Sequence, residues 1–314
     1  MKKKKSAVER KKLKKRILAR WQLYLWLLVP VIYFLLFKYY PMFGIQLAFK
    51  KYNAGLGIWK SEWIGLDNFL RFFKSYYFER TITNTIRISL YSLLVGFPLP
   101  IIFALMLNTM RSIKYKKFVQ MATYLPHFIS TVVLVGMVFQ VFNPRIGIYG
   151  MIYNYITGSN TAPDILGKAN AFPHLYVWSG VWQSIGWGSI IYISALSSVD
   201  AELHDAARVD GASRFRRIIH IDIPCIIPTI VVMLILRFGT IMSVGFEKTY
   251  LFQNNLNLVT SEVISTYSYK MAFNGSGSDF GLSTAIGLFN NVIEAILVII
   301  VNTISKKVSD NSLW

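Results

Sequence analysis

Residues 205–244 read DAARVDGASRFRRIIHIDIPCIIPTIVVMLILRFGTIMSV, a polar, basic stretch that runs directly into an apolar one. The apolar part is close to 20 residues long. At about 1.5 Å rise per residue, a helix of that length matches the roughly 30 Å hydrocarbon core of a bilayer. The stretch therefore predicts a membrane-spanning helix that follows a polar loop.

Outward from this stretch, the rest of the chain repeats the apolar pattern. Of the 314 residues, 54% are hydrophobic and 15% aromatic, more than the surface of a soluble protein leaves room for. The sequence predicts an all-α membrane protein with six transmembrane helices, at residues 21–37, 84–107, 119–142, 176–196, 226–244 and 282–304. Glycines and prolines inside these segments, such as Gly186 and Gly188, predict kinks.

The distribution of basic residues predicts the orientation. Residues 1–20 hold eleven Lys or Arg and one acid, Glu9, and such clusters stay on the cytoplasmic side. With six crossings, we expect both termini in the cytoplasm; 21 of the 34 basic residues then lie inside and eleven lie in the three outside loops. We expect a basic tail at 1–20, a membrane domain at 21–305 and a short tail at 306–314.

The net charge of +19 would also fit a nucleic-acid-binding protein. Its concentration immediately before the first apolar segment instead favours contact with anionic membrane lipids, so we expect no nucleic-acid partner. The loop at 38–83 predicts a turn at 53–57 and an amphipathic helix at 66–78 headed by Asp67. Further short interfacial helices are expected near 149–156 and 261–269.

The polar loop at about 198–225 predicts a small helical hairpin. Ser198 or Asp200 can cap a first helix, Gly211 can end it in a left-handed turn, and Ser213 can cap a second, basic helix. Pro224 then marks the return to the membrane. From these residues alone, an ordinary polar loop and a knob that another protein grips are equally good interpretations.

This loop resembles the EAA loop of binding-protein-dependent ABC importer permeases. The family pattern is Glu-Ala-Ala, three residues, Gly, nine residues, Ile, any residue and Leu-Pro; here Asp205 replaces the Glu and Ile223 replaces the Leu. In the family, the loop docks in a cleft of the ATPase subunit. The resemblance therefore assigns docking to Asp205, Ala206, Ala207, Asp210, Gly211, Ala212, Ile221 and Pro224.

Nearly the whole chain is similar to carbohydrate importer permeases of the MalF-like type, in the subgroup that handles complex oligosaccharides or polysaccharides. The similarity rests on Tyr40-Pro41-Met42-Phe43-Gly44, Phe49-Lys50-Lys51-Tyr52, Gly65-Leu66-Asp67-Asn68-Phe69, Asp279-Phe280-Gly281-Leu282 and Ser312-Leu313-Trp314. It implies a multi-pass subunit of the bacterial cytoplasmic membrane that translocates a carbohydrate. The implied partners are a second, homologous permease, two ABC ATPase subunits and an extracytoplasmic solute-binding protein.

The residues offer no enzymatic chemistry. A phosphate loop ending in Gly-Lys-Ser or Gly-Lys-Thr is absent, because Gly167-Lys168 is followed by alanine, so ATP and Mg²⁺ are expected on a partner ATPase and no cofactor on this chain. The four histidines have no metal-ligand spacing, so no metal site is expected. A membrane-embedded glycosyltransferase, a channel or an ABC permease for a non-sugar solute are the alternatives.

Polar residues inside the predicted spans are candidates for a substrate pathway, because a central charge costs about 2.5 to 3.5 kcal/mol on insertion. Aromatic faces suit pyranose rings, and amides or carboxylates suit sugar hydroxyls. The candidates are Trp182, Gln183, Trp187, Arg237, Asn290, Asn291 and Glu294. The alternatives are interface anchoring for the tryptophans, hydrogen bonds between helices, and an Arg237–Glu294 ion pair.

Overall fold

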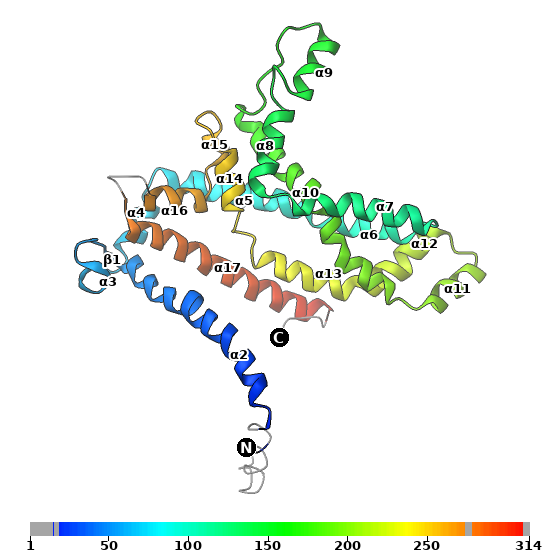
Figure 1. The fold of residues 1–314 in the computed structure, drawn as a ribbon, viewed down its shortest axis with the longest axis horizontal. Helices are drawn as coiled ribbons and strands as arrows, with labels where there is room; N and C mark the ends of the chain where they lie inside the picture. Colours follow the sequence, from blue (N-terminus) through cyan, green and yellow to red (C-terminus); the bar gives the residue numbers. More distant parts are fainter. Residues whose placement is uncertain (1–14, 16–18, 274–277, 310–314) are drawn as a thin grey trace.

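The computed structural model is an elongated helical body (Figure 1). It describes residue 15, residues 19–273 and residues 278–309. Most of the predicted basic tail at 1–20 therefore lies outside the described residues, as do 310–314 with Ser312, Leu313 and Trp314. The described part is predominantly helical, in agreement with the predicted class, and adds one antiparallel pair of β1 (Lys50–Lys51) and β2 (Glu62–Trp63).

The helices follow one another closely along the chain. In order they are α2 (Trp21–Phe34), a π turn (Leu35–Tyr39), a 3-10 helix (Tyr40–Phe49), α3 (Gly57–Lys60), α4 (Asp67–Phe73), α5 (Tyr77–Gly96), α6 (Pro98–Asn108), α7 (Ile113–Tyr124), a 3-10 turn (Leu125–Phe128), α8 (Thr131–Val141), α9 (Ile148–Thr157), a 3-10 turn (Ala169–Ala171), α10 (Phe172–Ser197), α11 (Ala201–Val209), α12 (Arg214–Arg217), a π turn (Ile218–Asp222), α13 (Ile223–Phe238), α14 (Phe246–Phe252), α15 (Leu258–Ser261), α16 (Ile264–Phe273) and α17 (Phe280–Ser309).

Four continuous helical segments are long and apolar enough to cross a membrane: Trp21–Phe49, Tyr77–Asn108, Arg214–Phe238 and Phe280–Lys307. A fifth is possible if the pair Ile113–Phe128 and Thr131–Val141, bent by 103°, counts as one span. The remaining predicted span, at 176–196, falls within α10, which has 26 residues but is rich in Trp, Tyr, Ser and Gly. These residue types lower its mean hydropathy below that of the four apolar segments.

The predicted span at 119–142 is broken rather than straight. Pro126 lies in the 3-10 turn after α7, Ile129 is extended with ψ 130°, and the Ser130 side chain accepts a bond from the Val133 N–H to start α8. A capping serine after an extended residue begins a new helix in a new direction. The apolar run from Val119 to Phe142 continues through this bend, so the apolar pattern shows no trace of it.

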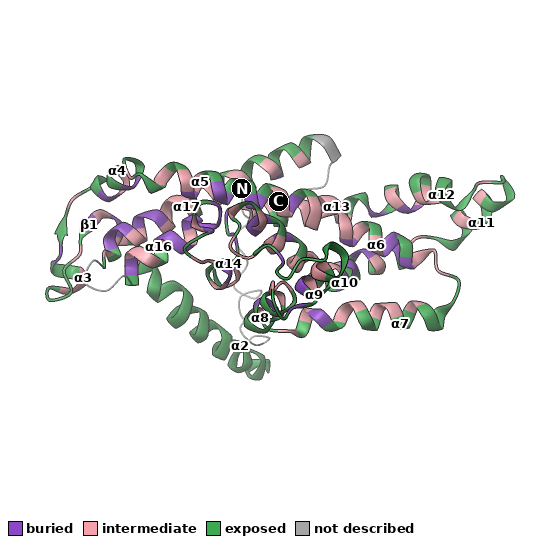
Figure 2. Ribbon diagram, turned by 90° about the horizontal axis from the view of Figure 1, so that it is seen from above, coloured by how far each residue is buried: buried purple, intermediate pink, exposed green. Residues whose placement is uncertain are grey.

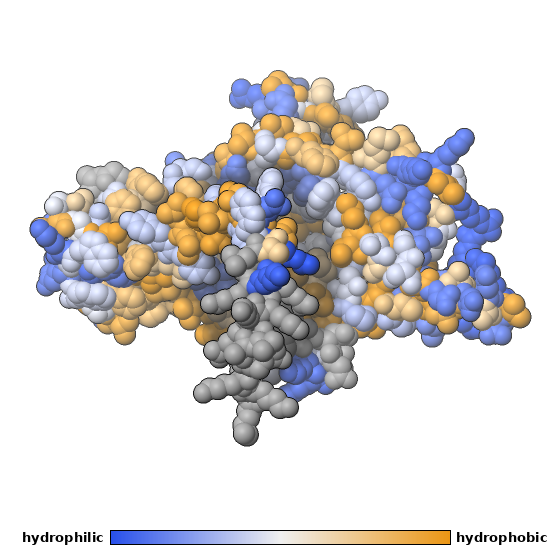
Figure 3. Space-filling model, turned by 60° about the horizontal axis from the view of Figure 1, so that its bottom comes forward, coloured by the Kyte–Doolittle hydropathy of each residue, from blue (hydrophilic) through white to orange (hydrophobic). Residues whose placement is uncertain are grey.

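Buried side chains form three clusters along the long axis. One lies where α4, α16 and α17 meet, one surrounds α14 and the start of α10, and one joins α6, the end of α10 and α13. Figure 2 shows buried residues along the inner helices and α2 exposed over its length. Figure 3 shows hydrophilic residues at the two ends of the body and hydrophobic surface between them, as expected for a protein within a bilayer.

The outer loops follow the predictions in part. The turn at Asn53 forms, and its Oδ1 accepts from the Gly55 N–H at 2.9 Å. The predicted helix at 66–78 is shorter, because α4 ends at Phe73 and the Ser75 hydroxyl accepts from the Tyr77 N–H, where α5 begins. The helix expected near 149–156 is α9, which projects from the body in Figure 1. The segment near 261–269 includes α16, which packs against α17 in the core, and its place at a membrane interface stays a prediction.

Candidate functional site

The polar loop forms the predicted hairpin at one end of the long axis (Figure 1). The Asp200 carboxylate accepts from the Glu202 N–H at 2.9 Å and caps α11; Ser198 instead donates to the Ala195 carbonyl at the end of α10. Gly211 has φ +73°, and the Ala212 N–H donates to the Ala207 carbonyl at 2.8 Å. This is a Schellman C-cap, which needs a residue that tolerates the left-handed region.

The second helix of the hairpin also begins as predicted, since the Ser213 hydroxyl accepts from the Arg216 N–H at 3.3 Å. This second helix does not end at the hairpin but continues into the span that follows. From α12 the helix passes through the π turn into α13, and Pro224 lies in the first turn of α13. A π turn just before a proline absorbs the missing N–H and the steric clash of the ring, so the chain enters the span without a break.

The residues assigned to docking are mostly accessible. Asp205, Ala206, Asp210, Gly211 and Pro224 are exposed, and the remaining three, Ala207, Ala212 and Ile221, are partly buried. Two large apolar side chains stand out beside them, Val209 at 88% and Phe215 at 72% exposure. Sequence reasoning missed both, although apolar residues in an otherwise polar loop are a usable signal for a protein contact.

A polar contact ties the hairpin to the span that follows. Asp222, at the end of the π turn, is 3% exposed, and its Oδ1 lies 3.3 Å from His204 Nε2 on α11. The Asp205 carboxylate, in contrast, accepts from Arg208 on the solvent side of α11 at 2.8 Å. This contact links α11 to the beginning of α13.

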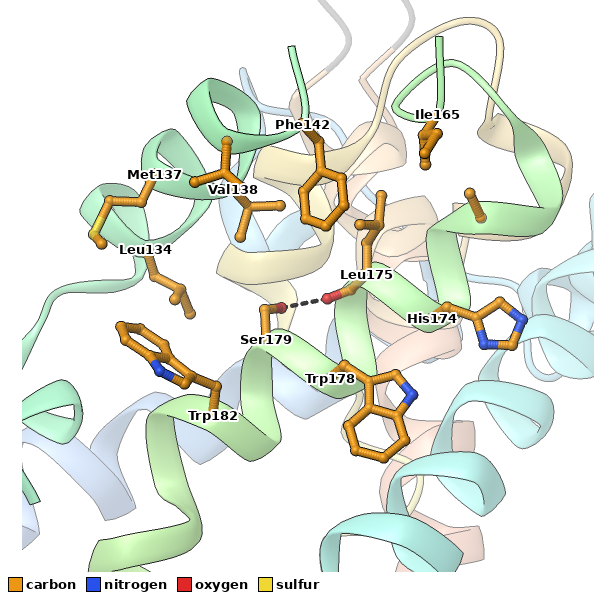
Figure 4. Close-up of a pocket in the computed structure, with 12 residues that line it drawn as sticks. Leu134, Met137, Val138, Phe142, Ile165, His174, Leu175, Trp178, Ser179 and Trp182 are labelled. Atoms are coloured by element: carbon orange, nitrogen blue, oxygen red, sulfur yellow. Dashed lines mark hydrogen bonds between the residues drawn. The ribbon is translucent and has the colours of Figure 1, made fainter. Parts of the chain in front are cut away.

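The tryptophans of the proposed pathway lie on different faces of α10. Trp182 and Trp187 are five residues apart, which rotates them by about 140° around a helix. Trp182 lines an apolar cavity of about 570 Å³ between α8 and α10, together with Leu134 and Trp178 (Figure 4). Gln183 and Trp187, four residues apart, are not among the residues that line it.

Three of the seven pathway candidates meet in a different cavity. Gln183, Trp187 and Arg237 line a space of about 540 Å³ among α5, α6, α10, α13 and α14, which we name the central cavity. The Gln183 Nε2 donates to the Ile129 carbonyl at 2.8 Å. The Trp187 ring stacks on His127 with centroids 4.5 Å apart.

The other candidates on α17 lie elsewhere. Asn290 and Asn291 line a separate cavity of about 380 Å³ beside α16. Glu294 accepts from the Ser243 hydroxyl at 2.6 Å and from the Asn290 amide at 3.5 Å. Among the ion pairs of the described residues there is none between Arg237 and Glu294, so that alternative is wrong.

The central cavity contains one cation that sequence reasoning missed. Lys248 on α14 donates from Nζ to the Tyr176 carbonyl at 2.7 Å, and the same Nζ lies 4.7 Å from the centre of the Tyr176 ring. Burial lowers the pKa of Lys248 to about 7. Lys248 lies four positions after the end of the predicted span at 226–244, so sequence reasoning placed it in a loop.

The chain is similar in sequence to known transport proteins. The family model described as "Binding-protein-dependent transport system inner membrane component" matches residues 96–310. Protein LplB of Bacillus subtilis is 41% identical over 93% of this chain and 91% of its own. The polygalacturonan/rhamnogalacturonan transport system permease protein YteP of Bacillus subtilis is 38% identical over 98% of this chain and 94% of its own.

Solved structures give the same picture. A chain of a bacterial ABC transporter involved in the import of the acidic polysaccharide alginate superposes with a TM-score of 0.86 and 39% identity, over 95% of this chain and 99% of that one. A chain of the alginate transporter in complex with an alginate pentasaccharide-bound periplasmic protein superposes equally well, at 38% identity and with the same coverage.

Proposed function

The chain belongs to the family of binding-protein-dependent transport system inner membrane components, and we propose that it carries oligosaccharides or polysaccharide fragments inward across the bacterial cytoplasmic membrane. It is the permease subunit of a sugar ABC importer and not an enzyme, since ATP hydrolysis belongs to a separate subunit. This family membership removes the glycosyltransferase and channel alternatives.

The importer needs further subunits. The permease pairs with a second, similar permease and with ABC ATPase subunits, and a solute-binding protein delivers the sugar. We propose two ATPase subunits that hold ATP and Mg²⁺, with no cofactor on this chain. The exposed α2, apolar except for Gln22, is consistent with contacts to lipid and to other membrane helices.

The proposed topology has six crossings with both termini in the cytoplasm. The bent pair of α7 and α8 counts as one crossing and α10 as another, in addition to the four apolar helical segments. The basic residues support this arrangement, because the loop between α6 and α7 and the hairpin of α11 and α12 then both face the cytoplasm. The membrane domain would comprise residues 21–305.

The proposed mechanism couples the hairpin to the pore. The exposed end of α11, from Asp205 to Ala212, docks in a cleft of an ATPase subunit. ATP binding closes the ATPase pair and moves α11, and the His204–Asp222 contact passes the movement to α13, which lines the central cavity. The cavity then switches its access between the two sides of the membrane. The observation that carries this proposal is the exposed, capped hairpin directly continuous with a span.

The test is a detergent pull-down of the tagged chain, comparing wild type with Asp205→Arg. Reversing the charge of this exposed carboxylate is expected to remove the ATPase while the second permease still co-purifies. Glu79→Arg, an exposed charge reversal at the far end of α5, is the matched control and should retain both partners. Recovery of wild type without any ATPase or permease partner would contradict the importer proposal, and retention of the ATPase by Asp205→Arg would contradict only the docking site.

A further inference from the structure

The central cavity carries positive charge without a compensating acid. Its lining includes Arg237 from α13 and Lys248 from α14, but no Asp or Glu side chain. In the part of the chain that the structure describes, neither cation forms an ion pair with a carboxylate. Charged groups inside a membrane protein are costly and normally face a partner of opposite charge or a water-filled path.

The surroundings of Lys248 hold its ammonium in the cavity wall. One of its three donors reaches the Tyr176 carbonyl, and the ring of the same tyrosine lies beneath it. A Cβ added at Gly180 would lie 3.0 Å from Nζ, so the absence of a side chain there makes room for the ammonium. The cation is thus fixed in position, while two of its donors have no acceptor among the described residues.

The other groups in the lining suit a sugar. Trp187 and Tyr176 offer aromatic faces for pyranose rings, and Gln183, Ser184 and Thr240 offer hydrogen-bonding groups for hydroxyls. The volume of about 540 Å³ falls within the ordinary range of small-molecule sites. A ligand that complements all of these groups has hydroxyls for the polar side chains, apolar ring faces for the aromatic ones and negative charge for the two cations.

We propose that the transported carbohydrate is an acidic oligosaccharide, and that its uronate carboxylates pair with Arg237 and Lys248 in the central cavity. The inference rests on the proposed function and adds the class of sugar to it. The planar guanidinium of Arg237 can take a carboxylate through two parallel hydrogen bonds, whereas the ammonium of Lys248 acts as a compact point charge.

The experiment measures uptake by the complete importer in proteoliposomes, with binding protein, both permeases and ATPases. Two probes are used: an oligogalacturonate and its methyl ester of the same length, which lacks the negative charges. For Arg237→Gln and for Lys248→Met, KM for the free acid is expected to rise about tenfold, as for the loss of one charged hydrogen bond, with little change for the ester. Lys248→Arg should keep uptake of the acid.

Lys60→Met removes an exposed lysine from an outside loop and is the matched control. Because the binding protein is the same throughout, a change in the acid-to-ester ratio between variants must arise in the permease. Equal losses for acid and ester would overturn the proposal and show that the two cations are structural or pair with the second permease. Wild-type uptake of neutral oligosaccharides alone would overturn the acidic class but leave the sugar function intact; uptake of no carbohydrate would overturn both.

Discussion

At the scale of single residues, Lys248 shows how burial changes what a side chain can do. A lysine in water keeps its charge far above neutral pH, but desolvation beside Tyr176 lowers the pKa of Lys248 from 10.5 to about 7. The Tyr176 phenol and the Arg237 guanidinium line the same cavity, and its lining contains no Asp or Glu side chain. The charge of Lys248 therefore changes within the physiological range.

This shift predicts a pH dependence of transport. At pH 6 Lys248 is mostly protonated and can bind a carboxylate, and at pH 8 it is mostly neutral, so uptake of an acidic oligosaccharide should fall as the pH rises through 7. Initial uptake rates in proteoliposomes at pH 6, 7 and 8 measure this. Lys248→Arg keeps its charge and should give a flatter profile. The same fall in that variant would assign the titration to another group.

Residues of the candidate pathway could be predicted from the sequence only where a polar or aromatic side chain interrupts an apolar span. Gln183, Trp187 and Arg237 satisfied that condition, and they meet in one cavity. Lys248 did not, because its position depends on how α14 folds back onto α10. Glu294 satisfied the condition but bonds to Ser243 at a different place, and spacing along a helix cannot tell which neighbouring helix a side chain meets.

At the scale of helices, the contact between α7 and α10 depends on one glycine. A Cβ at Gly186 would lie 2.3 Å from the Thr123 carbonyl oxygen on α7, a backbone atom that cannot move aside. The kink predicted at this glycine stays a prediction, and the helical assignment of α10 is continuous from Phe172 to Ser197. The residue allows two backbones to approach closely, a common use of glycine between membrane helices.

Gly186→Ala is therefore expected to destabilise the protein by about 1 to 3 kcal/mol, the usual cost of overpacking a close contact. Thermal unfolding in detergent, followed by circular dichroism, should show a lower midpoint. Gly287→Ala in α17 is the control: a Cβ there meets nothing within 4 Å, and alanine favours the helix. An unchanged midpoint for Gly186→Ala would show that α7 and α10 are not held at this distance.

Local signals along the chain predicted the ends of helices better than their directions. Asp200, Gly211 and Ser213 define the hairpin because a cap depends only on neighbouring backbone groups. The bend of 103° between the segments that end at Phe128 and begin at Thr131 leaves the apolar pattern of 119–142 unchanged, so periodicity could not reveal it. The direction of a helix is set by what it packs against.

At the scale of the whole molecule, that bend decides which side of the membrane each later loop faces. If the segment from Ile113 to Val141 crosses as a broken span, α9 and the loop after it lie outside and the α11 hairpin lies in the cytoplasm, where an ATPase can reach it. If the segment is re-entrant, the order of sides is reversed from residue 142 onward. The bend alone is compatible with both arrangements.

Cysteine labelling tests the proposed six crossings. In a Cys225→Ser background, which removes the native, exposed cysteine, single cysteines are placed at three exposed positions, Lys60, Lys114 and Ser159. A membrane-impermeant maleimide added to intact cells should label Lys60→Cys and Ser159→Cys at once, and Lys114→Cys only after permeabilisation. Labelling of Ser159→Cys solely after permeabilisation would make the bent segment re-entrant. In that case α11 could lie in the cytoplasm only if α10 did not cross the membrane either, which would leave four crossings in all.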